Sequence, residues 1–137
     1  MIPSIIYGEC HKDKRGLLSY NNSFDASIVK RFYTIENNLN LIRGWQGHKI
    51  EQRWFSVIKG EFEIKLIKIN DWDNPEKKNK KIIFKLSDEA LDILHVPAGY
   101  ITSIESFIKG GKLLVMSDYK LGDINDDYKF SRETFIQ

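Results

Sequence analysis

The feature that most restricts how this chain can fold is a series of short segments rich in β-branched and aromatic residues. Turn residues separate them, as at Lys59-Gly60, Pro97-Ala98-Gly99 and Gly110-Gly111. Short strands at such spacing are typical of an antiparallel sandwich or barrel. The predicted strands are Leu17–Asn21, Ile28–Glu36, Arg53–Lys59, Glu61–Ile69, Lys81–Leu86, Leu91–Val96, Ile101–Phe107 and Lys112–Tyr119.

The segment Glu61–Ile69 has the clearest strand pattern. Phe62, Ile64 and Leu66 recur with a period of two, and the same period continues to Lys68. Successive side chains of a strand point to opposite faces, so these residues should share one face of a half-buried strand.

Two segments depart from this pattern. Asp71–Lys81 is polar and rich in lysine, so we expect a solvated surface loop there and favour it over a phosphate-binding patch. The tail Gly122–Gln137 carries Tyr128, Phe130 and Phe135 among charged residues. We expect it to form a short helix or an extended arm, packed either on its own barrel or across a dimer.

Composition excludes several classes of protein. The formal net charge of +2 creates no strong field that would attract nucleic acid or a membrane surface, and no apolar run approaches the ~20 residues that span a bilayer. The single cysteine, Cys10, has no partner for an internal disulfide, and the N-terminus lacks the features of a secretory signal. We therefore expect one cytoplasmic domain over residues 1–137, with no nucleic-acid or membrane partner.

The densest group of reactive side chains lies in the segment Arg43–Arg53. On a regular strand, Gln46 and His48 would share one face, and Arg43 and Trp45 would share the other. A bulge at one of the two glycines of the segment would change this registration. The face that carries Gln46 and His48 is the candidate interior of the barrel.

A turn near Glu51 could bring Arg53 into the same cavity. An imidazole, an amide and a guanidinium that line a small barrel would suit a polar, anionic ligand. The residues alone leave a second interpretation equally open, in which His48 is a structural histidine satisfied by hydrogen bonds within the fold.

A metal site is not expected from these residues. Barrels of this kind often bind a divalent ion through two histidines one residue apart, a carboxylate and a later histidine. Only His48 fits, because Gln46 occupies the partner position and Arg53 stands where a carboxylate is needed. His11 and His95 are isolated in the sequence.

Nucleophilic catalysis and cofactor binding are not indicated either. Cys10 and His11 are adjacent, so on an extended chain their side chains point apart. The sequence contains no nucleophile elbow, no glycine-rich phosphate loop and no dinucleotide fingerprint. We therefore expect no cofactor.

Several motifs in a fixed order give the chain a family resemblance over nearly its whole length. They are Asp13-Lys14-Arg15-Gly16, Ile28–Ile35, Arg43-Gly44, Gln46–Lys49, the Gly60 turn, Val96–Gly99, Ser117–Tyr119 and Asp126–Tyr128. In these motifs the chain resembles the dTDP-4-keto-6-deoxyglucose 3,4-ketoisomerases (the FdtA/WxcM-like cupins). It is similar, more distantly, to the dTDP-4-dehydrorhamnose 3,5-epimerases.

The resemblance implies an all-β fold: a cupin-type antiparallel β-barrel, or jelly roll, with a short C-terminal arm or helix. It also implies an isomerase or epimerase that needs no cofactor and acts on a dTDP-4-keto-6-deoxyhexose in surface polysaccharide synthesis. In such a reaction a base removes the proton next to the keto group, and an enediol or enolate carries the charge.

The resemblance also assigns roles to individual residues. The implied catalytic residues are His48 as acid and base, Arg53 beside the enolate oxygen, and Tyr33 and Tyr119 as pocket hydroxyls. The implied substrate-binding residues are Arg15 and Arg43 for the diphosphate, together with Trp45 and Gln46.

The sequence departs from the family at Gln46, where the relatives carry the first of two histidines. Glutamine cannot act as a base, so we keep an alternative in which the chain is a non-catalytic cupin that binds a nucleotide sugar or regulates another glycan enzyme. A homodimer is implied in either case, and the short apolar segment Ile2–Tyr7 could pair with the sheet edge of a second copy.

Overall fold

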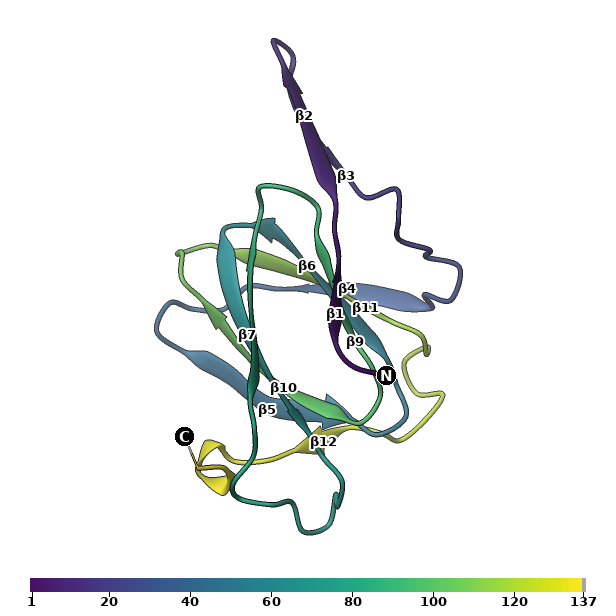
Figure 1. The fold of residues 1–137 in the computed structure, drawn as a ribbon, viewed down its shortest axis with the longest axis vertical. Helices are drawn as coiled ribbons and strands as arrows, with labels where there is room; N and C mark the ends of the chain where they lie inside the picture. Colours follow the sequence, from purple (N-terminus) through teal and green to yellow (C-terminus); the bar gives the residue numbers. More distant parts are fainter. Residues whose placement is uncertain (137) are drawn as a thin grey trace.

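The computed structural model describes residues 1–136 and folds them into two facing five-stranded sheets and a separate hairpin (Figure 1). All strand pairs are antiparallel. The first sheet has the order β1 (Ser4–Ile6), β9 (Ile93–Val96), β6 (Arg53–Lys59), β11 (Lys112–Ser117) and β4 (Arg31–Ile35). The second has the order β12 (Tyr128–Lys129), β5 (Ile42–His48), β10 (Tyr100–Ser106), β7 (Glu61–Lys68) and β8 (Ile82–Ser87).

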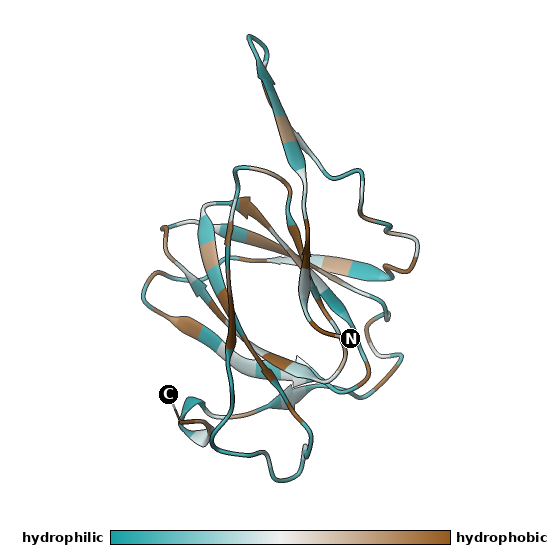
Figure 2. Cartoon of the chain, viewed as in Figure 1, coloured by the Kyte–Doolittle hydropathy of each residue, from teal (hydrophilic) through white to brown (hydrophobic). Residues whose placement is uncertain are grey.

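The main core lies between the two sheets. From β7, Phe62, Ile64 and Leu66 point inward and are fully buried, as the period of two predicts, whereas Lys68 at the end of the strand is exposed. They meet Phe55 and Val57 of β6, among other residues, in one apolar cluster. Figure 2 shows apolar stretches on strands of both sheets and a mostly hydrophilic loop after β7. The all-β prediction is confirmed.

The predicted strands correspond closely to the observed ones. The largest difference is at Ile28–Glu36, where β4 begins only at Arg31 because residues 28–30 follow a turn. There the amide N–H of Val29 donates to the carbonyl of Ala26, and the Val29 side chain packs on the outer face of the first sheet. No strand interrupts the loop Asp71–Lys81.

The C-terminal segment packs against its own barrel. Strand β12 pairs with the edge of β5, and a short 3-10 helix, η1 (Arg132–Thr134), follows it. Trp45 exchanges two backbone hydrogen bonds with Phe130, and its ring meets that of Phe135 edge to face. Of the two placements predicted for the tail, the structure therefore has the one on the same chain. Residue 137, the last residue of the expected domain, lies outside the described residues.

Strands β2 (Glu9–Asp13) and β3 (Gly16–Tyr20) form a hairpin that projects away from the two sheets (Figure 1). Its apolar residues Leu17 and Leu18 are exposed. Within residues 1–136, no helix has the length and apolar character needed to cross a bilayer.

Candidate functional site

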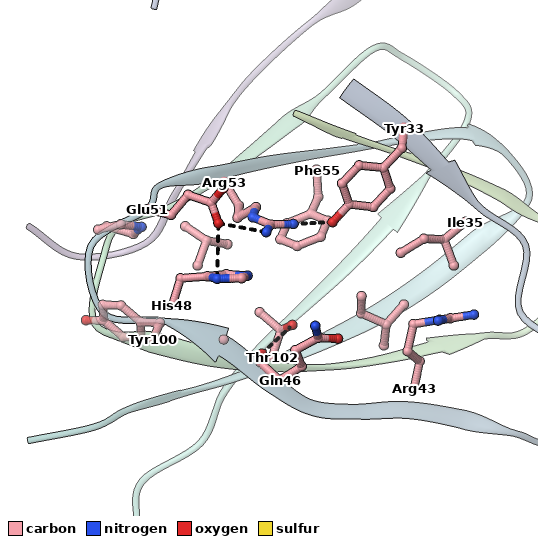
Figure 3. Close-up of a pocket in the computed structure, with 14 residues that line it drawn as sticks. Tyr33, Ile35, Arg43, Gln46, His48, Glu51, Arg53, Phe55, Tyr100 and Thr102 are labelled. Carbon is pink, nitrogen blue, oxygen red and sulfur yellow. Dashed lines mark hydrogen bonds and ion pairs between the residues drawn. The ribbon is translucent and has the colours of Figure 1, made fainter. Parts of the chain in front are cut away.

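A cavity opens between the two sheets (Figure 3). An adjoining hollow lies beneath the C-terminal segment that runs from Lys120 to Asp127. The two hollows share one wall, so a ligand could occupy both. The shared wall consists of Tyr33, Gln46, His48, Glu51 and Arg53.

A bulge in β5 determines which of its side chains reach this cavity. Thr102 of β10 lies opposite Gln46, but the next residue, Ser103, lies opposite Gly44, so Trp45 has no opposite residue on β10. Arg43 therefore lies on the cavity side together with Gln46. The expectation that Arg43 shares a face with Trp45 was wrong because the extra residue shifts the alternation by one.

Trp45 packs on the opposite side of the sheet. It is buried with Ile67, Ile69, Ile101 and Phe135 in a separate apolar cluster, and it lines neither hollow. Its predicted role in substrate binding is wrong for this structure, since the sheet itself separates the indole from the cavity.

Strand β5 approaches β10 unusually closely at Gly47. A Cβ atom at this position would lie 2.2 Å from the carbonyl oxygen of Tyr100 and 2.5 Å from the Cα of Ile101. Only glycine fits there without a shift of the backbone. The next residue, His48, takes its place at the cavity wall.

Glu51 is the centre of the polar network in this wall. Its side chain is buried, and Oε1 accepts a hydrogen bond of 2.6 Å from the hydroxyl of Ser117. Its Oε2 lies 2.8 Å from Nη2 of Arg53 and 3.1 Å from Nδ1 of His48. Burial alone would raise the pKa of Glu51, but the hydrogen bonds from Ser117 and Arg53 together with the charge of Arg53 hold it below the usual value. The group is therefore a carboxylate at neutral pH.

The imidazole of His48 is oriented by two acceptors on the same nitrogen. Nδ1 lies 2.7 Å from the carbonyl oxygen of Asp126, in addition to its contact with Glu51. Since both neighbours accept hydrogen bonds, Nδ1 carries the proton of the neutral ring. Nε2 forms no hydrogen bond within residues 1–136, and it is free to accept a proton.

Burial is the main cause of a lowered pKa at His48. The positive charge of Arg53 lowers this pKa further, and the carbonyl of Asp126 and the carboxylate of Glu51 act in the opposite direction. His48 is consequently neutral at pH 7, the state in which an imidazole can act as a base.

Asp126 holds the turn that follows β5. Its carboxylate accepts hydrogen bonds from three successive backbone amides, at 2.9 Å from Lys49, 2.8 Å from Ile50 and 2.8 Å from Glu51. The same residue offers its carbonyl to His48. A single residue of the C-terminal segment thus fixes both the turn and the ring.

Arg53 connects the carboxylate to a phenol. Its Nη1 donates a hydrogen bond to the hydroxyl of Tyr33, while Nη2 binds Glu51 (Figure 3). Its Nε is buried without a partner in the described residues. Arg31 lies over the other part of the site, with its guanidinium carbon 5.1 Å from the centre of the Tyr33 ring. The structure therefore places Tyr33 and Arg53 in the wall, as expected.

Gln46 and Arg43 lie on the side of the cavity that the second sheet forms. Nε2 of Gln46 donates a hydrogen bond of 2.7 Å to the Asp127 carboxylate, which belongs to the C-terminal segment. Arg43 lies at the far end of the cavity, where its Nε is 3.3 Å from the side-chain oxygen of Asn37. Both residues line the cavity, and their role in substrate binding stays a prediction.

Two residues named from the resemblance lie elsewhere. Arg15 is at the tip of the projecting hairpin, paired with Asp13 at 2.7 Å, and it lines neither hollow of the site. Within one chain it cannot contact a ligand in the cavity. Tyr119 follows the end of β11, and its side chain does not line either hollow because the chain has already left the sheet. Both predictions fail in the single chain.

Three residues that could hold a metal ion meet in the wall: His48, Glu51 and Asp126 have ligand atoms within 4.8 Å of one another. The sequence analysis placed Arg53 where a carboxylate ligand would be needed, and it did not consider Glu51 and Asp126 beside His48. The group nevertheless does not fit a cation. Both oxygens of Glu51 are occupied, the Asp126 carboxylate is used by three amides, and the guanidinium of Arg53 would repel the ion.

Sequence reasoning missed Glu51, Ser117 and Asp126 as parts of the site. Glu51 was treated only as part of a turn, although its spacing of two from Arg53 was a usable signal for a shared face. Ser117 and Asp126 were noted as motif residues. Nothing in a single sequence indicated that either would contact Glu51 or its turn.

The scan of family models gives no match for this chain, and neither does the search of curated proteins. Solved structures do match. A variant of the 3,4-ketoisomerase QdtA of Thermoanaerobacterium thermosaccharolyticum, in complex with TDP-4-keto-6-deoxyglucose, is 24% identical; the match covers 91% of this chain and 85% of that chain, with a TM-score of 0.70. The chain has the fold of the sugar-nucleotide ketoisomerases.

Two further structures extend the similarity. A 3,4-ketoisomerase of Helicobacter canadensis is 24% identical, with 90% of this chain and 87% of that chain covered and a TM-score of 0.63. The dTDP-4-dehydrorhamnose 3,5-epimerase of Bacillus anthracis, with TDP and PPi bound, is 13% identical, with coverages of 90% and 76% and a TM-score of 0.72. The cupin-type fold is confirmed by these matches.

Proposed function

We propose that the chain is a sugar-nucleotide isomerase or epimerase that acts on a dTDP-4-keto-6-deoxyhexose by proton transfer, in the synthesis of a surface polysaccharide. The observation that carries the proposal is the position of His48 in the cavity wall. In the fold of the ketoisomerases, it presents an unengaged Nε2 to a cavity that also contains the Arg53 guanidinium and the Tyr33 phenol.

The proposed reaction needs a base, a cation and a proton donor. Nε2 of His48 removes the proton from the carbon next to the 4-keto group, and the electron pair of that C–H bond forms an enolate. Arg53 and the Tyr33 hydroxyl stabilise the negative oxygen. For epimerisation, the proton returns from Tyr33 or His48 to the opposite face of the same carbon, and the centre is inverted. For ketone migration, the enolate oxygen at C4 takes up a proton, the hydroxyl at C3 gives up its own, and C4 receives the proton from His48 or Tyr33, so the ketone moves without net oxidation.

Binding of the nucleotide sugar is supported by the cations around the cavity. Arg43 lies at one end, and Arg31 and Lys120 lie at the opening beneath the C-terminal segment. A guanidinium binds a diphosphate well because its N–H groups match the spacing of two phosphoryl oxygens. Gln46 would contribute hydrogen bonds from its amide.

One observation favours the second candidate, a non-catalytic nucleotide-sugar-binding or regulatory cupin. Gln46 stands where the relatives have a histidine, and its side-chain N–H is already bound to Asp127. The site would then bind the sugar nucleotide without exchanging its protons.

Proton exchange separates the two candidates. The protein is incubated with dTDP-4-keto-6-deoxyglucose in D2O, and deuterium at the sugar carbons is followed by NMR. The enzyme hypothesis expects exchange that is lost in His48→Asn and reduced in Tyr33→Phe but retained in Tyr119→Phe. Binding without exchange by the unmodified protein would instead favour the regulatory candidate.

We also propose that the chain forms a homodimer. The segment Ile2–Tyr7, which was expected to pair with a second copy, instead supplies β1, which pairs with β9 of its own chain, so the surface that we propose is the N-terminal hairpin. A two-stranded hairpin with exposed Leu17 and Leu18 has little stability of its own, so a second copy would bury it. In such a dimer Arg15 could reach the cavity of the other subunit, which it cannot do within its own chain. Analytical ultracentrifugation that finds only the 16.0 kDa species would contradict this proposal.

A cytoplasmic location is part of the same proposal. Its support is the single cysteine, Cys10, which is exposed and without a disulfide.

A further inference from the structure

We propose that Glu51 is the positioning residue of His48 and that its charge allows one histidine to serve as both proton acceptor and proton donor. The inference rests on the proposed function and extends it. It explains how the site could work although Gln46 replaces the first of the two family histidines.

Glu51 is placed to act through His48 rather than on a ligand. Ser117 occupies one of its oxygens, and Arg53 and His48 share the other, so neither oxygen faces the cavity without a partner. Its side chain is only 7% exposed. A carboxylate held in this way contributes its charge and its hydrogen bond to the imidazole.

Glu51 contributes a charge to the imidazole, whereas the carbonyl of Asp126 contributes a neutral hydrogen bond. Both acceptors keep the proton on Nδ1 and favour the imidazolium that forms when Nε2 takes a proton from the sugar, and Glu51 adds the attraction of a negative charge 3.1 Å from Nδ1. Without that anion, the nearby guanidinium of Arg53 would oppose the protonated ring. Glu51 thus lowers the free-energy cost of protonating the buried imidazole, so that His48 can take up the proton and later return it.

Other charged and titratable groups face His48 from several elements, so the contribution of Glu51 must be isolated by comparison. Arg53 comes from β6, and the remaining groups come from β4, β10 and the C-terminal segment. They are Arg31, Tyr33, Tyr100, Lys120, Asp126 and Asp127. A substitution at Glu51 leaves all of these side chains in place, but it removes the ion pair that Nη2 of Arg31 forms with Oε1 of Glu51 at 3.9 Å.

The test is an NMR titration of the His48 imidazole in the ligand-free protein. Glu51→Gln should lower the pKa of His48, because it removes an anion within hydrogen-bonding distance. Glu51→Asp, which keeps the charge, should restore part of the difference. Glu63→Gln is the matched control: this half-buried carboxylate pairs with Lys65 at 3.6 Å and lies far from the site in the β7 register. It should leave the His48 pKa unchanged.

Two outcomes would overturn the proposal. One is a His48 pKa that does not fall in Glu51→Gln. The other needs no variant: nitrogen chemical shifts of the unmodified protein that place the neutral-ring proton on Nε2 would exclude the proposed geometry. The second measurement decides the question even if Glu51→Gln does not fold.

The exchange assay then reports separately on the proposed function. If exchange occurs, Glu51→Gln should lower kcat by about 10-fold or more and change KM by less than about threefold, since both Glu51 oxygens are engaged by Ser117, Arg53 and His48. The acid limb in the pH profile of kcat/KM of Glu51→Gln should move to lower pH together with the His48 pKa. If the titration behaves as expected but the unmodified protein shows no exchange, the positioning role stands and the proposed enzymatic function fails.

Discussion

Removal of the Asp126 carboxylate should destabilise the protein far more than removal of its neighbour, Asp127. Asp126 is 5% exposed and binds three backbone amides, whereas the exposed Asp127 contacts Gln46 alone. The two aspartates are adjacent in sequence, so they form a matched pair. The comparison tests whether the C-terminal segment is a structural part of the site.

The magnitude follows from the three hydrogen bonds. A bond to a charged acceptor contributes about 1.5–3 kcal/mol, and a buried donor left without a partner costs a similar amount. The amide of buried Glu51 would lose its partner fully, while water could partly replace the carboxylate at exposed Lys49 and Ile50. Asp126→Ala should therefore cost about 3–5 kcal/mol, and Asp126→Asn, which retains one acceptor oxygen, about half as much.

Urea denaturation monitored by circular dichroism measures this difference. Asp126→Ala should shift the midpoint with an unchanged m-value and lower the Tm by about 10–20 °C for a chain of this size. Asp127→Ala should stay within about 1 kcal/mol of the parent. If the two variants were equally stable, the hydrogen bonds of Asp126 would not hold the turn, and the account of how His48 is oriented would fail with them.

Further predictions concern the two faces of β5 and the charges in the wall. Trp45→Ala should lower the free energy of unfolding by about 3–5 kcal/mol because it leaves a cavity in the outer apolar cluster, yet it should leave dTDP affinity in isothermal titration calorimetry nearly unchanged. Gln46→Ala should weaken dTDP binding and leave the free energy of unfolding nearly unchanged. Arg53→Gln should destabilise the protein by about 3–5 kcal/mol, since it leaves the Glu51 carboxylate buried without its cation, and an unchanged unfolding free energy would argue against the ion pair. Because His48 has a lowered pKa in the folded protein, its contribution to stability is present above the unfolded value of 6.5 and is lost as the pH falls through the folded value; His48→Asn should flatten that part of a plot of unfolding free energy against pH.

The strands of the barrel could be predicted because their signal is local. In β7 the alternation of Phe62, Ile64 and Leu66 reports directly on which face is buried, and the glycine turns mark the ends. β5 carries a weaker signal. Two glycines and several polar residues interrupt it, and it was recognised only as the reactive segment.

The site could be predicted only where its residues follow a local pattern. Gln46 and His48 follow the regular period and were placed correctly, but Arg43 was assigned to the wrong face because the bulge at Trp45 is a property of pairing with β10. Asp126 lies 75 to 78 residues from the groups that it binds. Such contacts depend on the complete topology, and a single sequence carries no local pattern for them.

The long separation between Asp126 and the turn after β5 also bears on the order in which the molecule assembles. Contacts between distant parts of a chain close slowly, because the intervening loop must lose its entropy before any contact compensates for it. Most of the core can form between β6, β7 and β11, all of which precede residue 120. Until residues 126–130 dock, β5 presents a free sheet edge and the ring of His48 lacks the carbonyl of Asp126. During biosynthesis, the proton-transfer site should therefore mature after the barrel around it, and chains interrupted before that step would be prone to associate through the uncovered strand.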